Sequence, residues 1–314
     1  MGAVKCTWQG VFPAATTQFG ADYAVDLDAT ARVFGNLIKD GVSGLIVCGT
    51  VGEGNTLSQA EKAAVIETGV AVARSAGGRT PILVGVAEYT AAFASDLART
   101  AKRLGADGLM LLPPMVYSGK ERETIEHFRK VAAATDLPVM LYNNPPAYRT
   151  DVTPRMLAAL ADVDTIVAYK EASGDTRRIV DIRNLTGDRF VPFCGLDDVV
   201  LESVALGAVG WVSGLSNVFP REGNALLALA RAGRFAEALR LYDWFMPLLH
   251  LDARPDLVQA IKLCERIAGR GSDRTRPPRL PLDAAEASEI EAIMAKALKT
   301  RPAIADVKAP AAAA

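Results

Sequence analysis

Eight short runs of continuously apolar residues are spaced along the chain, and stretches with the spacing of amphipathic helices follow them. A run that is apolar at every position is typical of a strand buried on both faces, as in a parallel sheet. Strict alternation of such strands with helices over eight units predicts an α/β fold, a (β/α)8 TIM barrel. The predicted strands are Gly10–Thr17, Gly44–Gly49, Ile82–Ala87, Gly108–Leu112, Pro138–Asn143, Thr165–Glu171, Phe190–Gly195 and Val209–Ser213.

An open doubly wound sheet is the alternative topology. It would show a G-x-G-x-x-G turn after the first strand, and the segment 13–22 has none. The helices expected between the strands carry recognisable end signals. Ser58 and Glu61 form an S-x-x-E capping box, and glycines such as Gly105 mark helix ends. The predicted helices are Leu27–Lys39, Ser58–Ser75, Thr90–Leu104, Glu121–Thr135, Thr153–Ala161, Thr176–Asn184, Val199–Leu206 and Arg221–Ala232.

The end of the chain predicts a helical appendix on the barrel. We expect the barrel over residues 1–232, a C-terminal helical extension over 233–300, and a disordered tail over 301–314, where alanine and proline dominate. Three helices are predicted within the extension: Arg234–Trp244, Asp256–Ala268 and Asp283–Leu298.

Composition argues against several classes of protein. The 314 residues are 50% hydrophobic and carry a formal charge of −1, which fits a globular protein. No charge run predicts binding to nucleic acid, and no apolar run reaches the ~20 residues that span a bilayer. The first nine residues lack the apolar segment of a secretory signal. The four cysteines form no C-x-x-C pair, so we expect reduced thiols and a cytoplasmic location.

The chain has only two histidines, His127 and His250, and neither has a second ligand at metal-binding spacing. A transition-metal site or a Ser-His-Asp triad is therefore not expected. The chemistry must come from Lys, Tyr, Thr, Glu or a cofactor.

Lys170 stands at the end of the sixth predicted strand, where barrel enzymes place catalytic groups. Lysine is almost never fully buried without a partner. One interpretation is an amine whose pKa is lowered by desolvation, so that a neutral nucleophile can form a Schiff base. The other is an ion pair with a neighbouring carboxylate such as Glu171.

Tyr142 and Asn143 end the fifth strand, next to the strand of Lys170. The phenol of Tyr142 could relay protons to a bound carbonyl or hydroxyl, or it could simply pack in the barrel mouth. Gly195, Val212 and Ser213, at the ends of strands seven and eight, could line the pocket. Asp197 and Asp198 could line it too, although we favour a helix N-cap for them.

The second strand runs into a loop with three glycines, Gly49, Gly52 and Gly54. Such a loop lets the backbone approach a ligand, and its N–H groups suit a carboxylate. The hydroxyl of Thr50 could donate a hydrogen bond or pass protons, and Val51 would form an apolar wall.

These motifs, taken together, resemble the dihydrodipicolinate synthase / N-acetylneuraminate lyase family, class I aldolase-like enzymes. The resemblance covers roughly residues 9–300 and implies a homotetramer that binds a 2-oxo acid as a Schiff base, without external cofactor or metal. It implies that Lys170 is the Schiff-base lysine, Tyr142 the proton relay, and the loop Gly49–Gly52, with Thr50, the carboxylate cradle. The matching segments are Gly49–Glu53, Tyr142–Pro145, Lys170–Asp175 and Gly195–Asp198.

Three departures bear on the substrate. The synthase has a second threonine where this chain has Val51, and a relay tyrosine aligned with Val116, beside Tyr117. It also has an arginine, five residues after the catalytic tyrosine, that binds a dicarboxylic substrate. Ala147 stands there in this chain, and Arg149 follows two residues later.

Four segments give the chain its resemblance to a hydroxyproline-degrading branch of the family, the Δ1-pyrroline-4-hydroxy-2-carboxylate deaminases. They are Gly49–Asn55, Tyr142–Arg149, Gly210–Leu215 and Phe245–Asp252. This resemblance implies conversion of the pyrroline to 2,5-dioxopentanoate and ammonia, with a small-molecule pyrroline carboxylate or 2-oxo acid as the binding partner. The alternatives are a dehydratase or aldolase of a sugar-derived 2-oxo-3-deoxy acid, dihydrodipicolinate synthase itself, and a catalytically silent binding barrel.

Overall fold

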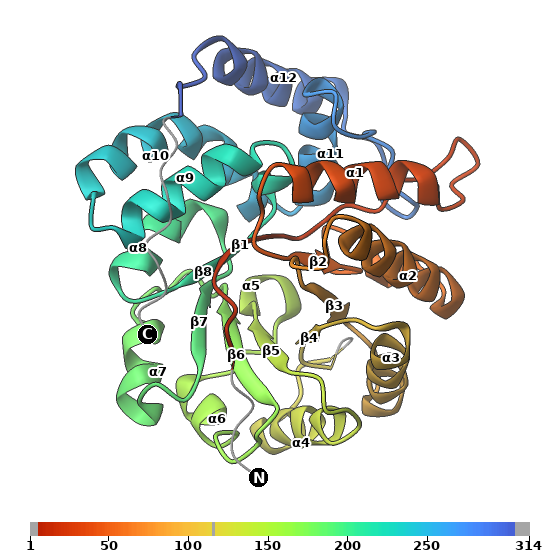
Figure 1. The fold of residues 1–314 in the computed structure, drawn as a ribbon, viewed down its shortest axis with the longest axis vertical. Coiled ribbons are helices and arrows are strands. Elements are labelled where there is room, and N and C mark those ends of the chain that lie inside the picture. Colours follow the sequence, from red (N-terminus) through yellow and green to blue (C-terminus); the bar gives the residue numbers. More distant parts are fainter. Residues whose placement is uncertain (1–5, 115–116, 305–314) are drawn as a thin grey trace.

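The eight predicted strands form one parallel sheet that closes into a barrel (Figure 1). The computed structural model describes residues 6–114 and 117–304. Strand order is β1-β8-β7-β6-β5-β4-β3-β2, and a parallel bridge between Ala14 and Ile46 joins β1 to β2. The (β/α)8 prediction is confirmed. The strands are β1 Gly10–Pro13, β2 Leu45–Val47, β3 Ile82–Val86, β4 Gly108–Leu111, β5 Val139–Asn143, β6 Ile166–Glu171, β7 Val191–Cys194 and β8 Gly210–Ser213.

Every predicted helix between the strands is present on the outside of the barrel. The capping box forms as expected, since Ser58 Oγ accepts from the N–H of Glu61 at 3.2 Å and Glu61 Oε2 accepts from the N–H of Ser58 at 2.8 Å. Gly105 ends its helix at φ 85°, which only glycine adopts readily. The helices are α1 Leu27–Lys39, α2 Gln59–Ser75, α3 Ala91–Leu104, α4 Glu121–Ala132, α6 Pro154–Ala158, α7 Arg178–Thr186, α8 Val200–Ala205 and α9 Pro220–Arg231.

The appendix consists of α10 Phe235–Leu249, α11 Leu257–Ile267 and α12 Ala284–Lys299. The predicted end of its first helix at Trp244 is wrong, because α10 continues through Pro247. A proline inside a helix removes one backbone hydrogen bond. Here the last turn places Phe245, Leu248 and Leu249 in the core, which offsets that loss. Residues 305–314 of the predicted disordered tail lie outside the described residues.

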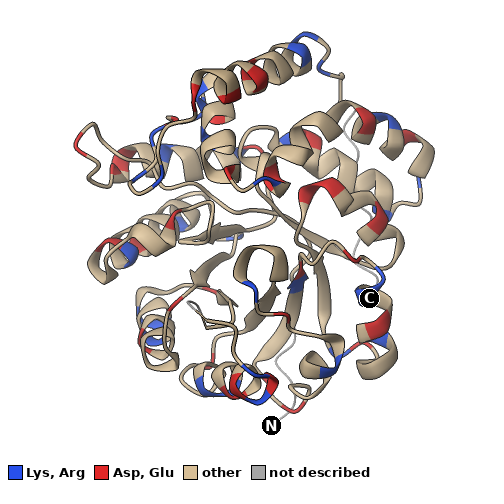
Figure 2. Ribbon diagram, turned by 180° about the vertical axis from the view of Figure 1, so that it is seen from behind, with Lys and Arg blue, Asp and Glu red and all other residues tan. Residues whose placement is uncertain are grey.

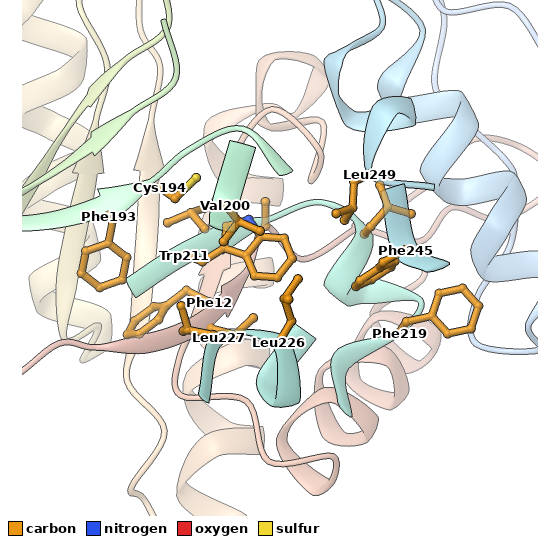
Figure 3. Close-up of a cluster of buried hydrophobic side chains, with 14 of the residues drawn as sticks. Phe12, Phe193, Cys194, Val200, Trp211, Phe219, Leu226, Leu227, Phe245 and Leu249 are labelled. Carbon is orange, nitrogen blue, oxygen red and sulfur yellow. The ribbon is translucent and has the colours of Figure 1, made fainter. Parts of the chain in front are cut away.

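One apolar core joins the appendix to the barrel (Figure 3). Phe12 of β1 packs edge-to-face on Phe193 of β7 at 5.4 Å between ring centroids. Trp211 of β8 is fully buried, and the ring centroids of Trp211 and Phe245 of α10 are 6.5 Å apart. The division at residue 232 stays a prediction, and the appendix contributes directly to the core around β1 and β8.

Charged residues of both signs are spread over the outer helices (Figure 2). Among the described residues, no helix has the length and apolar composition that crossing a bilayer requires. All four cysteines are free, and three of them are buried.

Candidate active site

Lys170 and Tyr142 face each other at the carboxyl end of the barrel. They are register partners on β6 and β5, and Lys170 Nζ lies 3.8 Å from the centroid of the Tyr142 ring. Both side chains are buried, at 6% and 4% exposure. Burial lowers the pKa of the Lys170 ammonium, with Asp252 the strongest opposing charge. The geometry therefore favours a neutral amine at this position.

The alternative ion pair between Lys170 and Glu171 is wrong. Successive side chains of a strand point to opposite faces, so Glu171 points away from the barrel interior. Its carboxylate accepts hydrogen bonds from Asn143 Nδ2 at 3.2 Å and from the N–H of Ser173 at 2.7 Å. Asn143, which we expected to bind substrate, is thus committed to Glu171 and to Asp151.

Gly195 gives the Lys170 side chain its room. A Cβ at this position would lie 2.8 Å from Lys170 Cγ and 2.7 Å from the carbonyl oxygen of Glu171. A substitution here would displace the stem of the lysine, so the glycine matters for the position of the amine.

The glycine-rich loop after β2 folds tightly over the barrel end. Cβ atoms at Gly54 and Gly52 would lie 2.0 Å from the Cys48 carbonyl oxygen and 2.7 Å from that of Ala15. Within the described residues, the backbone N–H groups of Thr50 and Val51 donate to no backbone carbonyl, whereas Glu53 and Gly54 do. These two N–H groups are suited to hold a substrate carboxylate.

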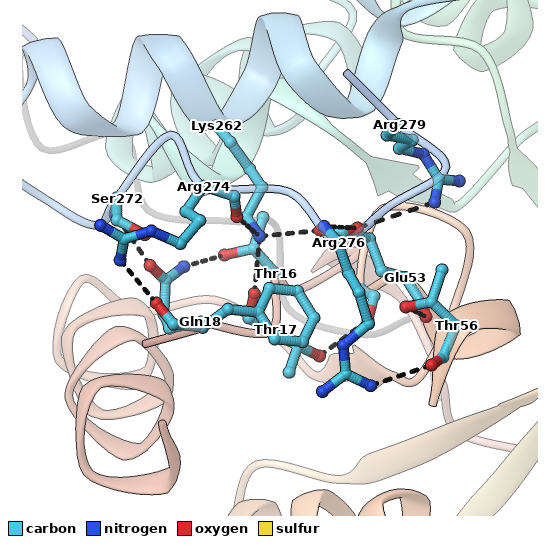
Figure 4. A network of polar contacts seen from close by, with 12 residues as sticks. Thr16, Thr17, Gln18, Glu53, Thr56, Lys262, Ser272, Arg274, Arg276 and Arg279 are labelled. Atoms are coloured by element: carbon cyan, nitrogen blue, oxygen red, sulfur yellow. Dashed lines mark hydrogen bonds and ion pairs between the residues drawn. The ribbon is translucent and has the colours of Figure 1, made fainter. Parts of the chain in front are cut away.

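The appendix fixes this loop through a buried ion pair (Figure 4). Nζ of Lys262, on α11, lies 2.8 Å from Oε1 of Glu53, and both side chains are fully buried. Lys262 also donates to the carbonyl oxygens of Thr17 and Arg274, and the N–H of Arg276 donates to Glu53. Glu53 adopts φ 53°, an uncommon conformation that these contacts hold in place.

Tyr148 was missed by the sequence analysis. It ends the short helix α5 Pro145–Tyr148, and its hydroxyl is hydrogen-bonded to Thr50 Oγ1. Its ring packs edge-to-face on Tyr142 at 5.8 Å. Burial raises the pKa of both tyrosines above the usual value, so both phenols are protonated at neutral pH. Together they form a chain of hydroxyl groups that leads from Thr50 toward Lys170.

A local signal could have revealed α5. Asn144 caps the helix by accepting from the N–H of Ala147 at 3.1 Å, and proline occupies the first helical position. Asn followed by Pro is a recognised helix start. The Asn144 side chain also donates to Tyr142 Oη at 2.9 Å, so the cap orients the phenol.

The N-cap interpretation of Asp197 is wrong. It starts the short 3-10 helix η2, Asp197–Val199, and its fully buried carboxylate turns toward β8 instead. It accepts from Trp211 Nε1 at 2.9 Å, from Ser213 Oγ at 3.1 Å, and from the N–H groups of Gly214 and Leu215. Ser213 is therefore engaged away from the cavity. Asp198 accepts from the exposed His250 at 3.0 Å.

A cavity at this end of the barrel brings most of the predicted residues together. Thr50, Val51, Tyr142, Lys170, Gly195 and Val212 line it, whereas Gly49 and Gly52 do not. Arg149 and Tyr117 are exposed outside it, and Val116 lies outside the described residues. The complete lining is Ala14, Thr50, Val51, Met110, Tyr142, Asn144, Ala147, Tyr148, Lys170, Gly195, Leu196, Val212, Gly214, Asp252 and Leu257.

A barrel of this topology, with a buried lysine beside a phenol at its carboxyl end, has the arrangement that lysine-dependent Schiff-base enzymes require. The chain belongs to the dihydrodipicolinate synthetase family, whose model matches residues 7–297. The predicted family is confirmed. Enzymes of this family bind a keto acid covalently through a lysine and need no metal or external cofactor.

The chain is similar over nearly its whole length to named relatives. It is 34% identical over 293 residues to the 4-hydroxy-tetrahydrodipicolinate synthase of Methanothrix thermoacetophila, covering 92% of this chain and 97% of that one. The dihydrodipicolinate synthase of Aquifex aeolicus superposes with a TM-score of 0.88 at 29% identity, covering 92% and 98%. YagE of E. coli K12, solved in complex with pyruvate, superposes with a TM-score of 0.87 at 28% identity, covering 93% and 99%.

Proposed function

We propose that this protein is a Schiff-base lyase that acts on a 2-oxo acid or a cyclic imine carboxylate through Lys170. The observation that supports it is the buried amine of Lys170 against the ring of Tyr142 inside a lined cavity. The neutral amine attacks C2 of the substrate, and the substrate carboxylate rests on the N–H groups of Thr50 and Val51. Tyr142, Tyr148 and Thr50 move the protons.

For the substrate we propose Δ1-pyrroline-4-hydroxy-2-carboxylate. Addition of Lys170 to C2 opens the ring and leaves a free amine on C5. Loss of a C3 proton gives an enamine, which expels the C4 hydroxyl as water. A proton shift from C5 then makes an imine there. Hydrolysis of the imine at C5 releases ammonia, and hydrolysis of the Schiff base at C2 frees Lys170. Two water molecules are consumed in these steps and one is lost from C4. The product is 2,5-dioxopentanoate.

The names of the relatives favour a second candidate, dihydrodipicolinate synthase. The cavity is less suited to it, because the position of the synthase arginine holds Ala147 and Arg149 is exposed. A dehydratase or aldolase of a sugar-derived 2-oxo-3-deoxy acid would use the same amine and relay. The silent binding barrel has less support, since the amine and the hydroxyl chain are all in place.

Product analysis tests these candidates. The purified enzyme is given the pyrroline, or pyruvate with aspartate semialdehyde, or a 2-oxo-3-deoxy sugar acid. Our proposal predicts ammonia and 2,5-dioxopentanoate from the first, and Lys170→Ala should abolish their formation. Consumption of pyruvate in the second mixture, with no ammonia in the first, would contradict the deaminase and support the synthase.

We also propose a homotetramer, because enzymes of this family are typically oligomeric. Light scattering of the full chain should then give the mass of four protomers. A cytoplasmic location is proposed because all four cysteines are free.

A further inference from the structure

Asp252 brings a carboxylate into the cavity from the appendix. It lies in the 3-10 helix η4, His250–Ala253, between α10 and α11. Of the described residues that line the cavity, Lys170 is the one with an amine and Asp252 the one with a carboxyl group. The proposed Schiff-base steps do not use Asp252.

The barrel provides a place for this carboxylate. Gly214, just after β8, has no side chain where Asp252 sits. A Cβ there would lie 2.2 Å from Asp252 Oδ1 and 3.1 Å from its Cγ. The backbone N–H of Asp197 donates to the Asp252 carboxylate, and the Asp197 carboxylate has four donors of its own. Asp252 is thus held at the cavity wall as an acceptor.

We infer that Asp252 determines substrate specificity: its carboxylate accepts a hydrogen bond from an O–H or N–H group at the distal end of the bound 2-oxo acid and disfavours a second carboxylate there. The inference rests on the proposed Schiff base at Lys170 and narrows its substrate class.

Charge complementarity supports this assignment. After condensation the positive charge of the iminium on Lys170 faces the C1 carboxylate of the substrate. A dicarboxylic acid would bring another negative charge into a cavity whose described lining offers Asp252 and no further cation. Like charges at short range in a partly buried site repel. A hydroxyl or amino group, as on the ring-opened pyrroline or a sugar acid, can instead donate a further hydrogen bond to Asp252.

A competition experiment with the full-length enzyme tests the inference. Equal concentrations of 4-hydroxy-2-oxobutanoate and 2-oxoglutarate are mixed with enzyme, reduced with borohydride, and the two adducts at Lys170 are quantified by mass. The adduct of each acid is also measured in competition with pyruvate, which has no polar group at its distal end. The ratio of adducts does not depend on how much enzyme is folded.

The expected result is an excess of the hydroxy-acid adduct in the wild type, which falls about tenfold in Asp252→Asn, the equivalent of about 1.4 kcal/mol. Asp252→Ser also removes the carboxylate, and it should lower the adduct ratio by a similar factor. The matched control Asp198→Asn removes a nearby carboxylate that does not line the cavity, and should keep the wild-type ratio.

An unchanged ratio in both Asp252 variants would overturn the inference. So would a loss of the pyruvate adduct in them, because Asp252 would then act on the Schiff base itself. If the wild type forms no pyruvate adduct at Lys170, the proposed function fails, and that outcome is distinct from a failure of Asp252 alone.

Discussion

The surroundings of Lys170 lower the pKa of its ammonium group, and this favours the neutral, nucleophilic amine. The residue is buried on all sides, lies over the Tyr142 ring, and has the glycine at 195 to accommodate its stem. The apolar strand around it predicted this burial, and the position at the strand end predicted its place in the site. The sequence could not decide between a free amine and an ion pair, since that depends on which face of β6 Glu171 occupies.

Tyr148 should act as the second hydroxyl of the relay. Tyr148→Phe breaks its bond to Thr50 while leaving Lys170 and Tyr142 in place. We expect turnover to fall by a factor on the order of 10², with the borohydride adduct retained, because proton transfer is slowed and condensation is not. Tyr169→Phe, a buried phenol on the other face of β6, is the matched control. Equal effects of the two changes would refute the relay.

The selectivity for distal hydroxyl or amino groups should depend on pH. Burial raises the pKa of Asp252 to about 6; Lys170 and the backbone N–H of Asp197 oppose this shift, and the Asp198 carboxylate adds to it. The pKa is raised, so the carboxylate exists above about pH 6 and is protonated as the pH falls through that value. The adduct ratio of the competition experiment should therefore decrease below pH 6 in the wild type and stay flat in Asp252→Asn. A flat wild-type ratio from pH 5 to 8 would contradict this.

The elements differ in how well sequence pattern defines them. Strands and long helices follow from apolar spacing and caps. The short pieces at the mouth, α5, η2 and η4, carry Tyr148, Asp197 and Asp252, and their positions depend on tertiary packing. Asp252 lies in η4, which directly follows the last turn of α10, a turn that lies beyond the predicted end of this helix at Trp244.

The contact between α11 and the glycine-rich loop should be essential for stability. Lys262→Met removes the nearest cation to the buried Glu53 and leaves that carboxylate with the more distant Arg279, 3.6 Å away. We expect the free energy of unfolding to fall by about 3 kcal/mol, because a buried charge loses its closest partner. Lys102→Met, which breaks an exposed pair with Asp136, should cost less than about 1 kcal/mol. Urea denaturation measures both, and similar losses would show that the buried pair has no special role.

At the level of the whole molecule, the barrel and its appendix form one functional unit. The appendix shares the apolar core around Trp211, holds the glycine-rich loop through Lys262, and supplies Asp252 and Leu257 to the cavity. The alternation of strands and helices was enough to predict the barrel. It could not show that the last helices complete the site, because those contacts join residues more than 200 positions apart, as between Lys262 and Glu53.

Locating the covalent bond would test the account most directly. The enzyme is incubated with pyruvate, reduced with borohydride, digested, and the modified peptide is sequenced by mass spectrometry. We predict a single modified residue, Lys170, and no modification in Lys170→Ala. An adduct on another lysine, or none at any pyruvate concentration, would contradict the account.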